Sequence, residues 1–262
     1  MKKIFLIFAL LAPMLFGCND NPDDNTLNIF SVEDDISLGQ QTSEEINNSP
    51  AEFPILDEGQ YPEAYAHLHR IRDNILNSGK VFYKDRFTWE MKIIHDDDVL
   101  NAFAAPGGYI YVYTGLIKFL EAEDQFAGVL AHEIAHADRR HVTDQLTKIY
   151  GIQFMLDVVL GTDQNAISDI AAQLAQLKFS RSAESDADEY SVIYLCPTEL
   201  EADGAADFFR RMDDSQRPPE FLSTHPNPEN RVEKIEEKEQ ELGCTGTEEH
   251  VQRYQDFKNS LP

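Results

Sequence analysis

The residues best suited to chemistry lie in the motif HEIAH, where His132, Glu133 and His136 follow an apolar stretch. On an α-helix, residues four apart lie about 40° apart around the axis, so both imidazoles could reach one metal ion. Glu133 falls between them in angle, where its carboxylate could reach a metal-bound water as a general base without binding the metal itself. Because three ionisable side chains on an apolar helix are costly unless a metal or cleft accommodates them, the motif predicts a zinc site.

A catalytic zinc site needs a third protein ligand and leaves a fourth position open to water. A metzincin would supply that ligand as a nearby histidine, but the positions that its motif requires hold Arg139 and Val142. His141 is no substitute, because on a continuous helix it would lie about 140° around the axis from His136. Together with Arg139 and Arg140, it is expected to form a solvated basic helix face.

The acidic stretch SRSAESDAD offers a carboxylate from a later helix as the third ligand. Glu184 and Asp188 lie four residues apart and share one helix face. Glu184 would complete the tetrahedron, and Asp188 could accept a hydrogen bond from the free ring N–H of a ligating histidine. Alone, such a run is more often a solvated helix face; beside a motif that lacks a ligand, the metal site is favoured. Arg181 is a weaker candidate for orienting either carboxylate.

The elements that must position these residues are mostly helical. A capping box at Ser31–Asp34 opens a short helix, and Asn227 with Pro228 opens the last one. Apolar periodicity predicts helices over about 65–76, 124–160, 166–178, 182–195, 199–212 and 228–242. Strands are expected at Phe87–Ile93 and Tyr109–Tyr113, with Ala102–Ala105 as a candidate third. The expected fold class is α+β and predominantly helical, with a small antiparallel sheet packed beside the HExxH helix.

Four segments occur in an order that resembles the HtpX and CAAX-prenyl-protease type of zinc metallopeptidases: NAFAAPGGYIYVYTGL, HEIAH, SRSAESDAD and THPNPENRV. The chain is similar to the soluble lipoprotein branch of that family, which includes LoiP and the catalytic domain of BepA. The resemblance covers roughly residues 31–242 and implies a zincin-like domain of the gluzincin type. It implies one zinc on His132, His136 and Glu184, Glu133 as catalytic base, and Asp188 as the aspartate of the ExxxD motif.

His225 matches a histidine of that family and sits in a loop that Pro226 keeps from being helical. Its imidazole could stabilise the oxyanion of a tetrahedral intermediate, or occupy the open zinc position and hold the enzyme latent. A plain surface histidine is the alternative. Ala104–Gly108 leads into an aromatic strand, and an exposed edge there could align an extended peptide by main-chain hydrogen bonds, although PGG could also be only a turn.

The resemblance implies a zinc-dependent endopeptidase of the bacterial cell envelope. Its expected role is quality control of misfolded or misassembled envelope proteins, with unfolded or extended polypeptide as substrate and the outer-membrane assembly machinery as a candidate partner. The rival hypothesis is a zinc-containing envelope assembly or chaperone-like factor with little or latent proteolysis.

The N-terminus has the features of a secretory signal. Lys2 and Lys3 precede an apolar run that ends at LFGC, which looks like a lipobox with Cys18 as the lipidated residue. We therefore expect a signal peptide at 1–17, a lipidated Cys18 with a flexible tether over 18–30, and a metallopeptidase domain over 31–262. The anchor implies a periplasmic lipoprotein, of the outer rather than the inner membrane. An ordinary signal peptide with an incidental cysteine is the alternative.

The charge and the cysteine content give two further expectations, one about binding partners and one about a disulfide. The 262 residues carry a formal charge of −25, which argues against nucleic acid as a charge-driven partner. Two cysteines follow Cys18, and outside the cytoplasm Cys196 and Cys244 are candidates for one disulfide, with two buried free thiols as the alternative.

Overall fold

The structure is a computed structural model that describes residues 30–161, 165–213, 220–226 and 230–262. The expected signal peptide, the lipidation site Cys18 and the tether up to residue 29 lie outside the described residues, as do Asn227 and Pro228. The last predicted helix begins at Arg231 in the described part, with Asn230 before its first turn.

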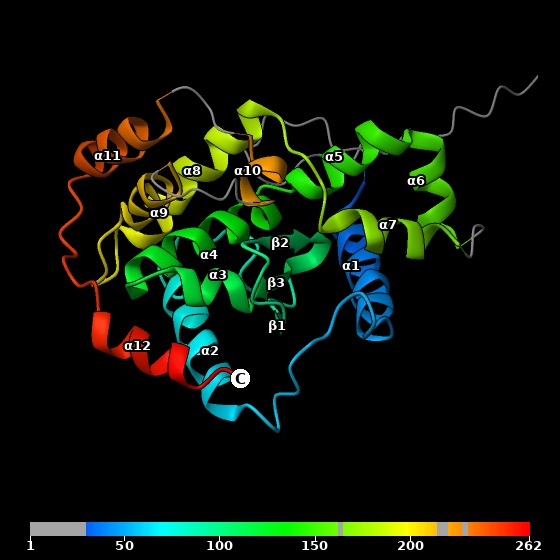
Figure 1. The fold of residues 1–262 in the computed structure, drawn as a ribbon. Coiled ribbons are helices and arrows are strands. Elements are labelled where there is room, and N and C mark those ends of the chain that lie inside the picture. Colours follow the sequence, from blue (N-terminus) through cyan, green and yellow to red (C-terminus); the bar gives the residue numbers. More distant parts are fainter. Residues whose placement is uncertain (1–29, 162–164, 214–219, 227–229) are drawn as a thin grey trace, which may run out of the picture.

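The described chain is predominantly helical, with one small sheet, which confirms the predicted fold class (Figure 1). The long helices are α1 (Val32–Asn47), α2 (Pro62–Leu76), α4 (Glu123–Asp138), α5 (His141–Tyr150), α8 (Arg181–Leu195), α9 (Gly204–Asp213) and α11 (Arg231–Leu242). The shorter ones are α3 (Thr114–Phe119), α6 (Ile152–Val159), α7 (Ala166–Leu174), α10 (Glu220–Thr224) and α12 (Val251–Asn259). The strands are β1 (Met91–Ile94), β2 (Ala102–Ala105) and β3 (Tyr109–Tyr113), with a 3-10 turn η1 at Pro106–Gly108.

The sheet has the order β1-β3-β2 and is mixed, so the expectation of an antiparallel sheet is wrong for one pair. The tight turn η1 makes β2 and β3 an antiparallel hairpin, whereas β1 pairs with the other edge of β3 in parallel. Strand β1 also begins later than the alternating pattern suggested, because Trp89 has a positive φ of 50° and turns the chain before Met91.

The predicted helical stretch over 124–160 is broken twice. Arg140 has a left-handed backbone with φ 59°, and Gly151 has φ 82°, so the stretch forms α4, α5 and α6. The break at Arg140 is stabilised by α1 and by the residue that precedes its N-cap: Arg140 Nε donates to Asp35 Oδ2 at 2.6 Å, and Arg140 Nη2 donates to the carbonyl of Phe30 at 2.6 Å.

The expectation that Arg139, Arg140 and His141 form a solvated basic face is therefore wrong. Arg139, Arg140 and His141 are only 2, 3 and 4% exposed. The turn between α4 and α5 directs all three side chains into the protein, where acidic partners from α1 and α8 compensate the buried charge.

Helix α4 lies in the middle of the molecule, with α8 and α9 packed along it and β2 against it (Figure 1). Helices α4 and α9 touch at glycines: a Cβ on Gly128 would lie 2.3 Å from the backbone nitrogen of Ala205. At its start, Glu123 accepts hydrogen bonds from Arg70 of α2 and Arg253 of α12. The helix that carries the HExxH motif is thus fixed on several sides.

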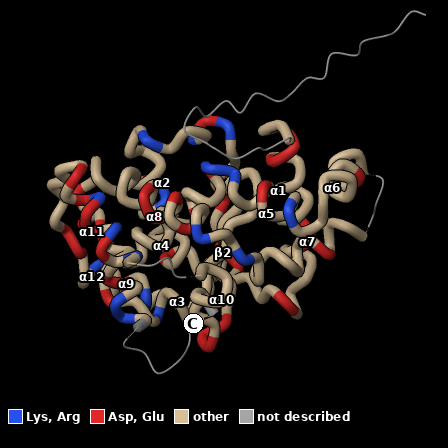
Figure 2. The backbone as a smooth tube through the Cα atoms, turned by 90° about the horizontal axis from the view of Figure 1, so that it is seen from above, with Lys and Arg blue, Asp and Glu red and all other residues tan. Residues whose placement is uncertain are grey.

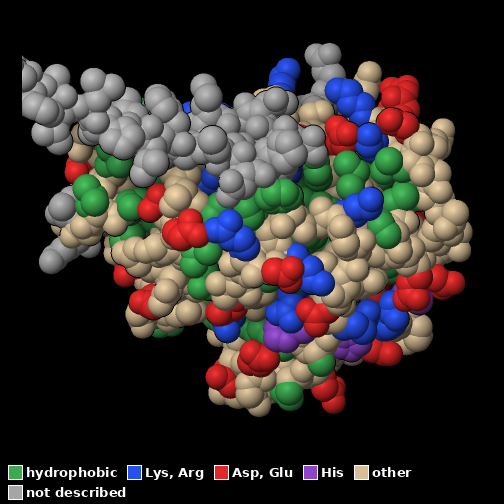
Figure 3. Space-filling view, turned by 180° about the vertical axis from the view of Figure 1, so that it is seen from behind, with side chains coloured by type: hydrophobic (Ala, Val, Ile, Leu, Met, Phe, Trp, Pro, Cys, Tyr) green, Lys and Arg blue, Asp and Glu red, His purple; other side chains and the backbone are tan. Residues whose placement is uncertain are grey.

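Other features bear on the earlier expectations. Ser31 and Asp34 form the predicted capping box at the start of α1. Cys196 and Cys244 form a disulfide that joins the end of α8 to the segment after α11, which confirms that candidate pair. Among the described residues, no helix combines the length and apolarity that a bilayer-spanning segment needs. Acidic and basic residues are interspersed along the chain (Figure 2) and across the rear face (Figure 3).

Candidate active site

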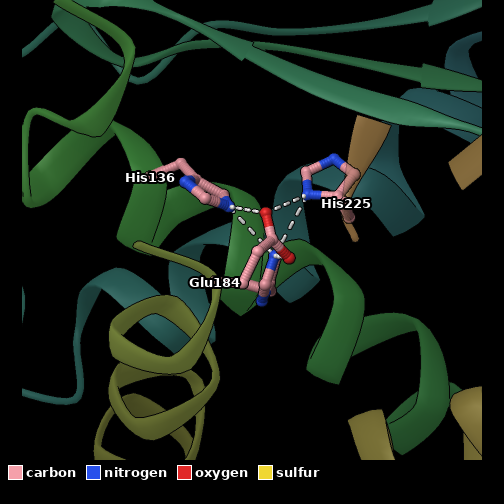
Figure 4. Close-up of side chains that lie close together, drawn as sticks. His136, Glu184 and His225 are labelled. Carbon is pink, nitrogen blue, oxygen red and sulfur yellow. Dashed lines mark hydrogen bonds and ion pairs between the residues drawn. The ribbon is translucent and has the colours of Figure 1, made fainter. Parts of the chain in front are cut away.

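Four buried side chains meet beside the sheet: His132, His136, Glu184 and His225. One nitrogen or oxygen of each lies within 4.8 Å of the others, and each residue is at most 1% exposed. The first two come from α4, the glutamate from α8 and the last histidine from the residue directly after α10. Figure 4 shows the labelled side chains pointing toward one another.

The two histidines of α4 present the same ring atom to this cluster. His132 Nε2 and His136 Nε2 are 3.0 Å apart, and they lie 3.6 and 3.4 Å from the carboxylate oxygens of Glu184. Ser180 caps the start of α8 by accepting from the backbone N–H of Ala183, which fixes the first turn, where Glu184 lies. Helices α4 and α8, whose first turns are fixed, therefore bring together the three metal ligands that the sequence predicts.

His225 supplies the fourth donor. Its Nδ1 lies 3.1 Å from Glu184 Oε1 and 3.4 Å from His132 Nε2. The backbone N–H of His225 donates to Phe221, whose ring stacks on the imidazole. His225 is therefore not a surface histidine, and the alternative kept open for it is wrong.

The electrostatics suit a cation. Burial holds the pKa of His136 well below its usual value, which keeps a lone pair on the ring. Burial alone would raise the pKa of Glu184, but the surrounding imidazoles lower it well below its usual value, so the carboxylate is ionised. Three imidazoles and one carboxylate, buried and converging, form the donor set that zinc prefers.

Glu133 lies beside the cluster and does not belong to it. Its carboxylate makes no close hydrogen bond in the described part of the chain; the backbone of Ala104 and His225 Nε2, 3.4 Å from Oε1, are its polar neighbours. Burial raises the pKa of Glu133 to about 7, and the neighbouring His225 acts in the opposite direction. A carboxylate with unused lone pairs and a pKa near neutrality can act as a general base.

The expected outer partner of a ligating histidine lies where it was predicted. Asp188 Oδ1 lies 2.9 Å from His132 Nδ1, the ring nitrogen that points away from the cluster. Asp188 and Glu184 together raise the pKa of His132 against the opposing effect of its burial. Asp188 therefore orients the ring of His132.

Arg231 holds the two carboxylates, a role that the sequence suggested for Arg181. Arg231 Nη2 lies 2.6 Å from Asp188 Oδ1 and 3.1 Å from Glu184 Oε2, and the guanidinium lies over the ring of Phe209. Arg181 is exposed at the start of α8. Arg231 is the basic residue of the segment THPNPENRV, so it could have been found by asking which cation in that segment balances the acids.

The edge of the sheet differs from the expectation. Since Tyr113 N–H donates to Asn101, the alternation of an antiparallel pair turns the peptide groups of Ala102 and Ala104 away from β3. All residues of β2 are nevertheless buried, so this edge is not exposed. Phe221 N–H donates to Leu100 just before β2, which places α10 beside this edge.

Comparison with known proteins adds an independent observation. Residues 62–239 match the family described as Peptidase family M48. A putative beta-barrel assembly-enhancing protease of Vibrio cholerae is 28% identical over 88% of this chain and 50% of its own length. The beta-barrel assembly-enhancing protease of Escherichia coli is 30% identical over 52% of this chain and 32% of its own length. The mitochondrial metalloendopeptidase OMA1 of Schizosaccharomyces pombe is 30% identical over 57% of this chain and 46% of its own length. The chain thus spans half or less of these relatives.

Proposed function

The chain belongs to peptidase family M48, as the order of its motifs indicated, and from that premise we propose that it is a zinc-dependent endopeptidase of the bacterial cell envelope. One observation carries the chemistry: His132, His136 and Glu184 converge in a buried cluster beside the buried carboxylate of Glu133. This is the arrangement of a hydrolytic zinc site with an adjacent base.

Each residue of the site has a separate role in the proposed reaction. Zinc held by His132, His136 and Glu184 would lower the pKa of a water molecule and polarise the scissile carbonyl. Glu133 would act as general base toward the attacking water and return the proton to the leaving amine. Asp188 holds the ring of His132, and Arg231 balances the charge of the carboxylates.

His225 fits a latent resting state. Its Nδ1 converges with the three other donors, so His225 could occupy the fourth position of a bound zinc, and its ring is buried against Phe221. Movement of His225 away from the cluster would open that position. The same residue could then stabilise the oxyanion of the intermediate. This closed arrangement also favours the rival hypothesis, a zinc-containing assembly or chaperone-like factor with little proteolysis.

The substrate that suits this site is an unfolded or extended polypeptide. The outward peptide group of Ala102 and the outward carbonyl of Ala104 offer the hydrogen bonds of a strand edge once α10 moves, while the backbone N–H of Ala104 faces Glu133. The names of the bacterial relatives support a role in the quality control of envelope proteins, with outer-membrane assembly machinery as partner.

The location follows from other features of the chain. A lipid on Cys18 would anchor a periplasmic lipoprotein, in the outer rather than the inner membrane, and residues 31–262 would form its peptidase domain. The disulfide between Cys196 and Cys244 supports an oxidising compartment.

Proteolysis and metal content test the proposal together. We expect one zinc per chain in the wild type, in Glu133→Gln and in His225→Ala, and loss of zinc in Glu184→Ala. Glu133→Gln should reduce casein and peptide-library cleavage by about 10²–10⁴-fold, because the base is lost. Exposed Glu63 provides the control Glu63→Gln, which should cleave like the wild type.

The His225 variant separates latency from oxyanion binding. A latent enzyme should cleave faster as His225→Ala and lose that gain as His225→Ala with Glu133→Gln, whereas an oxyanion role predicts slower cleavage. Undiminished cleavage after Glu133→Gln in whichever background cleaves, the wild type or His225→Ala, or absence of zinc from the wild type, would refute the endopeptidase. Zinc without cleavage in both the wild type and His225→Ala would favour the assembly factor.

A further inference from the structure

His136 has an outer partner of its own, on the side of the ring that faces away from the cluster. Its Nε2 lies with the other metal donors, while its Nδ1 lies 3.2 Å from His141 Nδ1. His141 Nε2 in turn lies 3.3 Å from Asp186 Oδ2, which also accepts a 2.9 Å hydrogen bond from Arg139 Nε. Side chains from α4, α5 and α8 thus form one continuous hydrogen-bond network that ends at the metal site.

Ligand chemistry sets the direction of the hydrogen bonds in this network. A histidine that binds a metal through Nε2 carries its proton on Nδ1, so His136 Nδ1–H must donate. His141 Nδ1 must then accept, which leaves the proton of His141 on Nε2, facing Asp186. The arrangement gives each of the three groups the donor or acceptor that its neighbour needs.

The break between α4 and α5 makes this contact. On a continuous helix, His141 would lie about 140° around the axis from His136 and point elsewhere. The left-handed backbone of Arg140 instead turns the first residue of α5 back against α4. His141 is 4% exposed, and no ligand atom of His141 belongs to the metal cluster of the described residues.

We propose that His141 and Asp186 form a positioning pair that fixes the ring orientation and tautomer of His136 for zinc binding. The proposal rests on the proposed zinc site. Asp188 serves His132 in the same way, so each ligating histidine of α4 has a separate carboxylate behind it, one directly and one through a second imidazole. Arg139 stabilises the far end, where its guanidinium pairs with Asp186 and stacks on Tyr190.

Metal affinity and cobalt spectroscopy of the full chain test this pair. His141→Ala should weaken zinc binding by about 10–100-fold and alter the d–d absorption of the Co²⁺-substituted protein. His141→Gln should recover most of the affinity, because its amide oxygen can accept from His136 and its amide N–H can donate to Asp186. Exposed His95 provides the matched control, and His95→Ala should change neither quantity.

These readouts measure metal binding and do not depend on proteolysis, so failure here is separable from failure of the proposed endopeptidase. Wild-type affinity with an unchanged cobalt spectrum in His141→Ala would overturn the proposal. So would a His141→Gln variant no better than His141→Ala, because packing alone would then explain the loss. If His141→Ala does not fold, Asp186→Asn takes its place; weaker zinc binding supports the pair, and unchanged binding overturns it.

Discussion

Replacement of Arg231 by methionine should destabilise the metal-free protein far more than the zinc-bound protein. Arg231 is 2% exposed and contacts the carboxylates of Glu184 and Asp188, which are also buried. Methionine retains an apolar side chain over the ring of Phe209 but leaves two acids without their cation. In the zinc-bound protein, the metal itself neutralises Glu184, so less of the charge is left unbalanced.

The expected size follows from the burial of all three groups. Removal of one partner from a buried ion pair typically lowers the free energy of unfolding by about 3–5 kcal/mol. For a chain of this size, that corresponds to a fall in the melting temperature of about 6–20 °C. Arg181, the residue that the sequence suggested for this role, is exposed, and Arg181→Met should change stability by less than about 0.5 kcal/mol.

Thermal unfolding with excess chelator and with excess zinc measures both quantities for the two variants and the wild type. The loss in Arg231→Met should be largest with chelator, and the gain in stability on adding zinc should exceed that of the wild type. The reasoning fails if Arg231→Met is no less stable than Arg181→Met in chelator. It also fails if zinc leaves the difference between Arg231→Met and the wild type unchanged.

Two further predictions concern stability away from the metal. The disulfide closes a separation of 48 residues, so replacing Cys196 and Cys244 by serine should lower the free energy of unfolding by about 4 kcal/mol, measured by urea denaturation; an equally stable double variant would contradict this. Burial raises the pKa of Asp124 to about 7, so the folded protein keeps a proton that the unfolded chain loses above about pH 4. The free energy of unfolding should therefore fall by up to about 4 kcal/mol as pH rises from about 4 to 7, and Asp124→Asn should remove that part of the slope in urea titrations with chelator. Parallel pH profiles for the wild type and Asp124→Asn would show that the aspartate is ionised in the folded state.

The part of the site that could be predicted is the part built from local spacing. His132 and His136 share a helix face because they are four residues apart, and Glu184 and Asp188 do so for the same reason. The two members of each pair are brought together by the geometry of a single helix, without any contact to another element. The contact between the two helices could not be derived from spacing, but a motif that lacked one ligand pointed to an acidic helix that could supply it.

The residues that were missed depend on contacts between distant parts of the chain. Arg231 reaches Glu184 across 47 positions, and no periodic pattern links them. His141 was rejected on the assumption of a continuous helix, since apolar periodicity runs through the left-handed turn at Arg140. The sheet posed the same difficulty, because the parallel pairing of β1 depends on which edge of β3 it meets.

Helix α1 has a part in the metal site although it lies outside the segment that matches the family. Asp35 accepts hydrogen bonds from Arg140 and from Thr143, on both sides of the first residue of α5. These contacts hold the turn that brings His141 against His136, so a buried aspartate about a hundred positions earlier in the chain constrains the outer shell of a metal ligand. The capping box at Ser31 fixes the start of α1 and hence the position of Asp35 one turn later. The geometry of His136 therefore depends on the first described residues of the chain as well as on its own helix.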